Sequence, residues 1–298
     1  MRILSIGNFG FGWDGSICDE EHIASALEEL GHEVTRLQRG EIFNYPDGNY
    51  DFILVAQWDG YTTLELAKSK YNCPLVYWAF DYQANGQTWH LHLIDTADIY
   101  LSKRIADSQY SNWQWLSQDF APSFLGRYDL KPERDIDVLF TGSYLPWAIE
   151  RNETLKAVDD KFNLTIHSVT PNQWKELGFK NVYGPVMDDG LTALIARSKL
   201  NISIDHTIEA GYWSDRNAQI MACGGMVLTR YVPLMETVFR DKVDYFYNIP
   251  DCLDKIEHLL GSEAERKVKG SQGYIYAHEY MMVKNRVQDL LTIVRNVL

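Results

Sequence analysis

A short stretch late in the chain, SDRNAQIMACGGMVLT (214–229), has the side chains of an anion-binding helix. Ser214 or Asp215 can cap the helix, and Arg216 places a cation in its first turn. There the backbone amides and the helix dipole already favour negative charge, which suits a diphosphate. The alternative is that Arg216 is balanced by Asp215 on a solvated helix end.

The rest of this helix adds a hydrogen-bonding group and a stop. Gln219 lies one turn beyond Arg216 on the same face, where its amide can bond ribose hydroxyls. Gly224 and Gly225 then end the helix, so that the apolar run 226–230 enters the sheet immediately.

Two carboxylates in the first half are candidates for a general base or for stabilising a positive charge that develops during reaction. Asp81 follows the apolar run PLVYWAF (74–80), and a charge at the carboxyl end of such a strand is expected to face a ligand cleft. It could instead cap the next helix. Asp14 lies in the glycine-rich loop GNFGFGWDGS (7–16).

That loop contains the spacing G-x-G-x-x-G, but it is longer than a tight dinucleotide-binding turn and is interrupted by Trp13 and Asp14. The second strand-like run is followed by Arg39 rather than by an acidic residue, so binding of NAD is disfavoured. A substrate loop without phosphate contacts explains the glycines equally well.

Further binding candidates stand beside strand ends. His206 and Glu209 follow the run LNISID (200–205) and can contact a sugar or a phosphate. Aromatic side chains make up 13% of the chain, and rings at strand ends stack on sugars or bases. The candidates for binding a second substrate are Trp13, Tyr82, Trp89 and His90. The alternative for the histidine pair in TWHLHL is a place on the surface or in the core.

Strand-like runs alternate with amphipathic stretches, which predicts an α/β protein with two doubly wound, Rossmann-like domains facing a cleft. The first set of strands is expected at 2–7, 32–38, 51–58, 74–80 and 98–103, and the second at 135–143, 164–169, 200–205 and 226–230. The polar segment 127–135 predicts the linker. We therefore expect a first domain over 1–130, a second over 131–275 and a final helical segment over 276–298, with a helix break near Gly273.

Composition limits the classes of function. Residues 1–130 carry 8 Lys+Arg and 18 Asp+Glu, a charge of −10, and the total of −13 leaves −3 for the remainder. Nucleic acid is therefore disfavoured as a partner of the first half, although a local basic groove could accommodate it. The four cysteines show no C-x-x-C spacing, no run approaches eighteen apolar residues, and no signal peptide is evident. We expect a cytoplasmic protein without a membrane span.

From SDRNAQIMACGG to the carboxyl end, the sequence resembles the second domain of GT-B glycosyltransferases. It is most similar to the CgeB-like (spore maturation protein) branch of the glycosyl transferases group 1 superfamily. DVLFTGS with R-N-E (137–153) resembles the start of the donor domain, and PLVYWAFDYQ (74–83) resembles the strand end that carries an aspartate in the acceptor domain.

The resemblance implies a nucleoside-diphosphate sugar held by the second domain, an acceptor held by the first, no obligatory metal or cofactor, and a final helix that crosses back to the first domain. The candidates for neutralising the leaving diphosphate are Arg216, the Gly142–Ser143 turn and Arg151. Asp81 and Asp14 remain the candidate catalytic carboxylates. The acceptor can be a saccharide, a protein or a modified nucleobase.

The sequence departs from the family pattern at one position that matters for the mechanism. Relatives carry Glu where this chain has Gln219, so the donor site loses a charge. Three functions stay open: a metal-independent glycosyltransferase, a GT-B sugar-nucleotide epimerase, and a non-catalytic module that binds a nucleotide sugar.

Overall fold

The computed structural model describes residues 1–10, 17–38, 46–56, 61–80, 89–122, 125 and 133–298, and at 61–64 and 89–92 it describes only the backbone. The described chain divides into two compact units. The first unit comprises Met1–Gln118 together with Val283–Leu298, and the second comprises Asp119–Met282. The predicted linker lies mostly outside the described residues.

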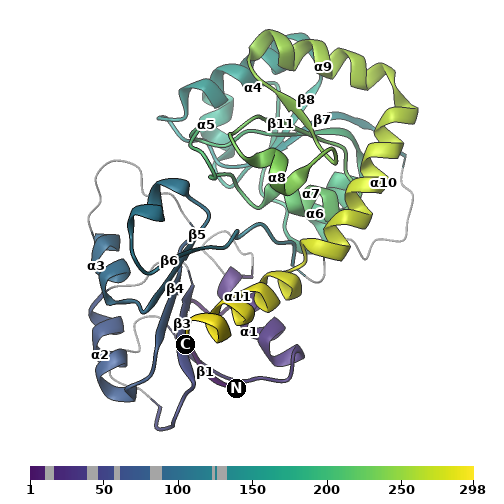
Figure 1. The fold of residues 1–298 in the computed structure, drawn as a ribbon. Helices are drawn as coiled ribbons and strands as arrows, with labels where there is room; N and C mark the ends of the chain where they lie inside the picture. Colours follow the sequence, from purple (N-terminus) through teal and green to yellow (C-terminus); the bar gives the residue numbers. More distant parts are fainter. Residues whose placement is uncertain (11–16, 39–45, 57–60, 81–88, 123–124, 126–132) are drawn as a thin grey trace. The chain divides into compact units, whose positions relative to one another are not determined.

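The first unit contains a six-stranded, entirely parallel sheet in the order β2-β1-β3-β4-β5-β6 (Figure 1). β3 and β4 are buried along their whole length, as is typical of parallel strands covered on both faces. The strands are β1 (Arg2–Gly7), β2 (Glu33–Gln38), β3 (Phe52–Ala56), β4 (Leu75–Trp78), β5 (Ile99–Ser102) and β6 (Trp113–Trp115).

The helices of the first unit connect these strands, and the last helix of the chain joins them. They are α1 (Asp19–Glu29), α2 (Tyr61–Tyr71), α3 (Trp89–Thr96), the 3-10 helix η1 (Ile105–Gln109) and α11 (Val283–Val297). α11 buries Val283, Val287, Leu290, Leu291 and Val294, a stripe with spacings of three and four residues, and it packs against α1. The carboxyl-terminal helix therefore returns to the first unit, as expected.

The second unit has its own six-stranded parallel sheet in the order β12-β11-β10-β7-β8-β9. Its strands are β7 (Ile136–Thr141), β8 (Leu164–His167), β9 (Asn181–Tyr183), β10 (Ser198–Ser203), β11 (Val227–Arg230) and β12 (Asp244–Phe246). Its helices are α4 (Ile149–Lys161), α5 (Pro171–Glu176), α6 (Asp188–Arg197), α7 (Arg216–Ala222), α8 (Met235–Phe239), α9 (Ile249–Gly261) and α10 (Glu263–Tyr280).

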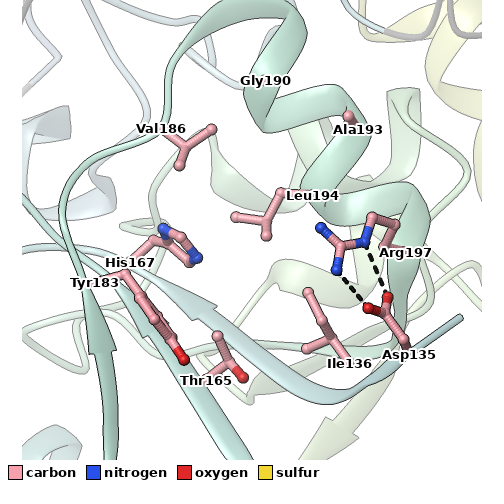
Figure 2. A pocket seen from close by; sticks show the side chains of 10 residues that line it. All are labelled: Asp135, Ile136, Thr165, His167, Tyr183, Val186, Gly190, Ala193, Leu194 and Arg197. Carbon is pink, nitrogen blue, oxygen red and sulfur yellow. Dashed lines mark hydrogen bonds and ion pairs between the residues drawn. The ribbon is translucent and has the colours of Figure 1, made fainter.

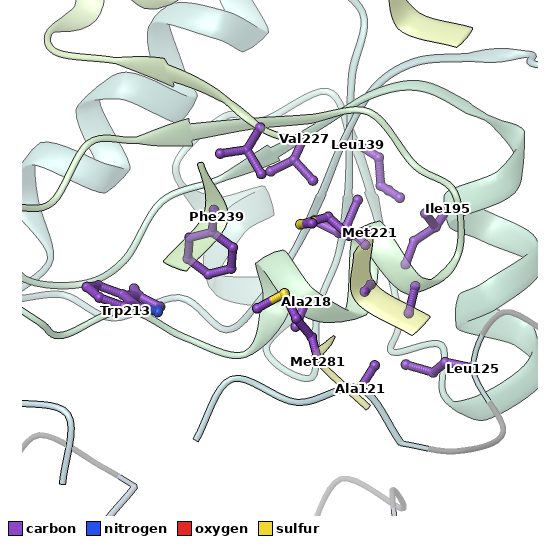
Figure 3. Close-up of a cluster of buried hydrophobic side chains, with 14 of the residues drawn as sticks. Ala121, Leu125, Leu139, Ile195, Trp213, Ala218, Met221, Val227, Phe239 and Met281 are labelled. Carbon is purple, nitrogen blue, oxygen red and sulfur yellow. The ribbon is translucent and has the colours of Figure 1, made fainter. Parts of the chain in front are cut away.

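Two apolar clusters cover the faces of this sheet. One packs α4, α5 and α9 against the strands and includes Trp174 and Phe140. The other packs α6, α7, α8 and the end of α10, with Met221 and Phe239 near its centre (Figure 3). Because successive side chains of a strand point to opposite faces of the sheet, β7 and β11 each contribute to both clusters, whereas the apolar residues of β10 belong to the first.

The predicted helix break near Gly273 is wrong. α10 runs without interruption through Gly273, and the chain turns at Met281–Met282 instead. A Cβ at Gly273 would lie 3.4 Å from the Met221 side chain, and one at Gly270 would lie 2.7 Å from the carbonyl oxygen of Gly224. Gly270 therefore allows α10 to approach the end of α7 closely, whereas a Cβ at Gly273 would make an ordinary van der Waals contact.

Candidate functional site

The strand order of the second unit creates a switch point beside its first strand. From β7 the chain continues to β8 and β9 on one side, then crosses to β10 and β11 on the other. The loops that leave β7 and β10 therefore diverge at the carboxyl edge of the sheet. Open α/β sheets bind their ligands at such a point.

Arg216, the first residue of α7, is held at this point by β7. Its Nε donates to the carbonyl oxygen of Thr141 at 2.8 Å, and its guanidinium lies 5.3 Å from the centre of the Phe140 ring. Its Nη1 is buried without a hydrogen-bond partner. The cation is therefore fixed in position while donor capacity is left for a ligand.

Arg151, in the first turn of α4, reaches the same ring. It is only 4% exposed, its Nη2 donates to the carbonyl oxygen of Ser143 at 2.8 Å, and its guanidinium lies 5.9 Å from the centre of the Phe140 ring. Its Nε also has no partner. Neither Arg151 nor Arg216 forms an ion pair with a carboxylate in the described part of the chain, which makes the pair suitable for binding an anion.

The electrostatics agree with this arrangement. Burial, and after it the nearby charge of Arg216, lower the pKa of Arg151 to about 10, while Asp205 and Tyr212 act in the opposite direction. Two cations that repel each other in a buried site are stabilised when a dianion binds between them.

Position 142 requires glycine because neighbouring side chains approach it closely. A Cβ there would lie 2.9 Å from the Phe140 ring and 3.3 Å from Nη2 of Arg216. The Gly142 amide donates to the carbonyl oxygen of His167 at 3.0 Å, which holds the turn against β8. The structure thus brings together four of the predicted donor-site residues: Gly142, Ser143, Arg151 and Arg216.

Ser214, another predicted donor-site residue, is held by Asp205, which was not among the predicted site residues. Asp205, just after β10, accepts from the Ser214 amide at 2.9 Å through Oδ1. Asp205 is 9% exposed and its Oδ2 has no partner, and the Ser214 hydroxyl is also buried without one. The sequence does indicate such a role, because Asp205 is the last residue of the run LNISID and so stands at the carboxyl end of a predicted strand.

The start of α7 differs from the expected cap. Asp215 is the N-cap residue, but its side chain makes no cap bond, and the Ser214 hydroxyl makes none either. The Asp215 carboxylate instead accepts from the side-chain amide of Gln219. Gln219 is thus paired one turn back along its own helix. No contact between Gln219 and the two arginines is seen among the described residues.

His206 and Glu209 lie in the loop between β10 and α7. The His206 ring meets the Tyr212 ring edge-on at 5.3 Å, and the Glu209 carbonyl accepts from the Tyr212 amide at 2.9 Å. Tyr212 is close enough to Arg151 to influence its pKa. These two residues therefore border the arginine pair through Tyr212.

The end of α7 explains its glycine pair. The Gly224 amide donates to the carbonyl oxygen of Met221, and the Gly225 amide donates to that of Ile220, which together form a Schellman motif. Gly224 has the positive φ, 71°, that this motif requires. A Cβ at Gly225 would lie 2.6 Å from Ile195 and 2.7 Å from Ile220.

Gly225→Ala should therefore destabilise the protein by about 1–3 kcal/mol, the usual cost of overpacking a buried site. Chemical denaturation measures this change. Gly261→Ala is the matched control, because nothing lies within 4 Å of its added Cβ. Equal stability of the two variants would contradict the packing argument.

A pocket of about 480 Å³ lies between α6 and the β7–β9 part of the sheet (Figure 2). It is lined by Asp135, Ile136, Thr165, His167, Tyr183, Val186, Gly190, Ala193, Leu194 and Arg197. At one end, Arg197 pairs with Asp135. At the other, the His167 ring stacks on the Tyr183 ring at 5.2 Å and approaches the Gly184 carbonyl oxygen at 2.9 Å through Nδ1.

Burial lowers the pKa of His167, so its ring is neutral at physiological pH. The histidine end of the pocket adjoins the arginine pair, because the carbonyl oxygen of His167 holds the Gly142 turn. The histidine end of the pocket therefore offers an uncharged, partly aromatic surface next to the arginine pair.

The candidates of the first unit cannot be placed. Asp14, Asp81, Trp13 and Tyr82 lie outside the described residues. Trp89 and His90 fall within α3, but their side chains are outside the described part.

Within the described ranges, no three His, Cys, Asp or Glu side chains converge as a metal site would require. None of the described helices is both long and apolar enough to span a membrane.

Solved structures with similar folds cover nearly the whole chain. Sucrose-phosphate synthase from Thermosynechococcus elongatus superimposes with a TM-score of 0.70 at 10% identity, covering 100% of this chain and 99% of that one. Alpha-glucosyltransferase in complex with UDP gives a TM-score of 0.71 at 12% identity, with 99% and 100% covered. The fold is of the GT-B type.

A third GT-B structure, Anabaena HepE in complex with UDP-glucose, has a TM-score of 0.68 at 14% identity, with 99% of this chain and 100% of that chain covered. Residues 151–292 match the model of a family described as glycosyl transferase-like. That range begins at Arg151 within α4 and ends within α11, and so includes both arginines. A comparison with curated proteins gave no match.

Proposed function

We propose that this protein is a glycosyltransferase that takes a sugar from a nucleoside-diphosphate sugar and transfers it to an acceptor. The observation that carries the proposal is the pair of guanidinium groups, Arg151 and Arg216, over Phe140 at the switch point of the second unit. The glycosyl transferase-like family match and the UDP-containing GT-B structures support it.

The two arginines have a direct chemical role in such a reaction. When the bond from the anomeric carbon to the diphosphate breaks, negative charge develops on the leaving oxygen. Arg216 Nη1 and Arg151 Nε, both without a protein partner, can donate to that charge. This stabilises the transition state without a metal, which is the mechanism we propose here.

The acceptor hydroxyl also has to lose its proton, and Asp81 is our first candidate for the base, with Asp14 the second. Trp13, Tyr82, Trp89 and His90 are the proposed acceptor contacts. One similar structure is described as alpha-glucosyltransferase in complex with UDP and a 13-mer DNA. The charge of −10 on residues 1–130 argues against DNA here and favours a saccharide or protein acceptor.

The pocket beside the arginines is proposed to take the nucleobase. It is uncharged at its histidine end, its stacked rings suit a planar heterocycle, and its volume is within the range of small-molecule sites. Uracil, in the form of uridine, is the first base to test, because two of the similar structures are described with UDP or UDP-glucose.

Tyr183→Ala should weaken the binding of uridine and of UDP alike, by roughly five- to a hundredfold, because stacking on an aromatic side chain contributes to both. Pyrophosphate should bind the variant as well as it binds the wild-type protein. Isothermal titration with the three ligands measures this. An unchanged affinity for uridine would exclude the Tyr183 end of the pocket as the base site.

Titration with UDP, GDP and TDP, followed by an assay for donor hydrolysis, tests the function itself. Binding with slow release of sugar supports a transferase. Interconversion of the sugar without any acceptor would indicate an epimerase, and binding without turnover for any acceptor would indicate a binding module. Absence of any nucleotide binding would reject all three.

A further inference from the structure

We propose that Asp205, together with Ser214, binds a hydroxyl group of the sugar being transferred and so helps to determine which donor is used. The inference rests on the proposed function and adds a residue to it. It starts from the fact that Asp205 is nine-tenths buried and keeps one carboxylate oxygen, Oδ2, without a partner.

Asp205 is held in place by the backbone. Its Oδ1 accepts from the Ser214 amide at 2.9 Å, so the carboxylate is fixed between the end of β10 and the start of α7. Oδ2 remains as a hydrogen-bond acceptor. The Ser214 hydroxyl, buried and without a partner, adds a group that both donates and accepts.

A buried carboxylate oxygen without a hydrogen bond is costly, so a ligand that donates to it is stabilised. Phosphate is unsuitable, because its oxygens carry the same charge as Asp205. Asp205 also lies close enough to Arg151 to raise its pKa. A neutral hydroxyl beside the arginine pair therefore fits this group best.

The strand order indicates that this hydroxyl belongs to the sugar rather than to the nucleoside. Along the carboxyl edge of the sheet, the histidine end of the proposed base pocket lies where β8 and β9 end, at His167 and Tyr183. The arginine pair lies at the end of β7, and Asp205 follows β10. A nucleotide sugar is arranged in the same order, with its diphosphate between the nucleoside and the sugar. With the nucleoside on the β8 side, the group that reaches Asp205 is the sugar.

Asp205→Asn tests this with little change in shape, because the amide oxygen can still accept from the Ser214 amide. The binding of UDP and of a UDP-hexose is compared, starting with UDP-glucose and using the hexose that the wild-type protein binds most tightly. We expect UDP to bind as tightly as before or more tightly, since a negative charge near the diphosphate is removed. The ratio of the dissociation constant for the UDP-hexose to that for UDP should rise about ten- to a hundredfold, since a charge-assisted hydrogen bond is lost.

Ser214→Ala is the second variant. It removes the hydroxyl but keeps the amide on which Asp205 depends, and the same ratio should rise less. An unchanged ratio in both variants would overturn the proposal, and so would an equal loss for UDP and the UDP-hexose, which would assign Asp205 to the nucleoside or to the fold. A wild-type protein that binds UDP but no UDP-hexose would also overturn it. If the wild-type protein binds no nucleotide at all, the proposed function itself fails.

Discussion

Arg216→Ala should weaken the binding of UDP by about ten- to a hundredfold, because each charge-assisted hydrogen bond to the diphosphate contributes roughly 1.5–3 kcal/mol. Uridine, which lacks the diphosphate, should bind nearly as before. The structural reason is that Arg216 is fixed by Thr141 and Phe140 and has an Nη1 without a partner. Isothermal titration with UDP and uridine measures both affinities.

Lys267→Ala is a suitable control, because it removes one positive charge from an exposed part of the same unit, where Lys267 pairs with Glu263. It should leave both affinities unchanged. Melting temperatures of the variants show whether each is folded. If Arg216→Ala binds UDP as tightly as the wild-type protein does, Arg216 is not part of a diphosphate site, and the proposed function loses the observation that carries it.

Asp81→Asn should lower turnover at least tenfold, which corresponds to about 1.4 kcal/mol on the activation barrier, with little change in the affinity for UDP. The expectation follows from chemistry: the amide cannot take a proton from the acceptor hydroxyl, whereas the nucleotide is proposed to bind to the other unit. Steady-state rates with a working acceptor, or donor hydrolysis without one, provide the measurement.

Asp95→Asn is the matched control for Asp81, because Asp95 is an exposed carboxylate on α3 of the same unit. Its turnover should equal that of the wild-type protein. Unchanged turnover in Asp81→Asn would remove Asp81 from the mechanism and leave Asp14 as the carboxylate to test next. A parallel loss of UDP affinity would assign Asp81 to binding instead.

The pair Asp215–Gln219 changes how the replacement of the expected Glu is interpreted. In sequence, Gln219 is a neutral residue at a position where the resemblance led us to expect Glu. In the structure, its amide donates to the Asp215 carboxylate one turn earlier on the same helix. A negative charge is therefore present beside position 219, although on a different residue.

Much of the fold could be predicted from the sequence, because parallel strands buried on both faces are continuous apolar runs. β1, β3, β4, β7 and β11 lie within predicted runs, and β10 overlaps the run 200–205 but begins two residues earlier, at Ser198. The three-residue strands β6, β9 and β12 were missed. Such short strands contain little periodicity and are defined by pairing with a neighbour that is distant in sequence.

The sequence by itself also determined that α7 begins with a cation and ends at Gly224 and Gly225, since local chemistry sets helix termini. Only the tertiary structure decided what surrounds that cation. Arg216 is surrounded by Phe140, Arg151 and Asp205, of which Phe140 is the most distant in sequence, 76 residues away. These residues come together because β7 and β10 pair in parallel. Gly273 shows the same limit: in sequence it suggests a helix break, whereas in the structure it lies inside α10, which packs against α7. Local patterns specify local conformation, but the groups that a residue contacts depend on the packing of the whole unit.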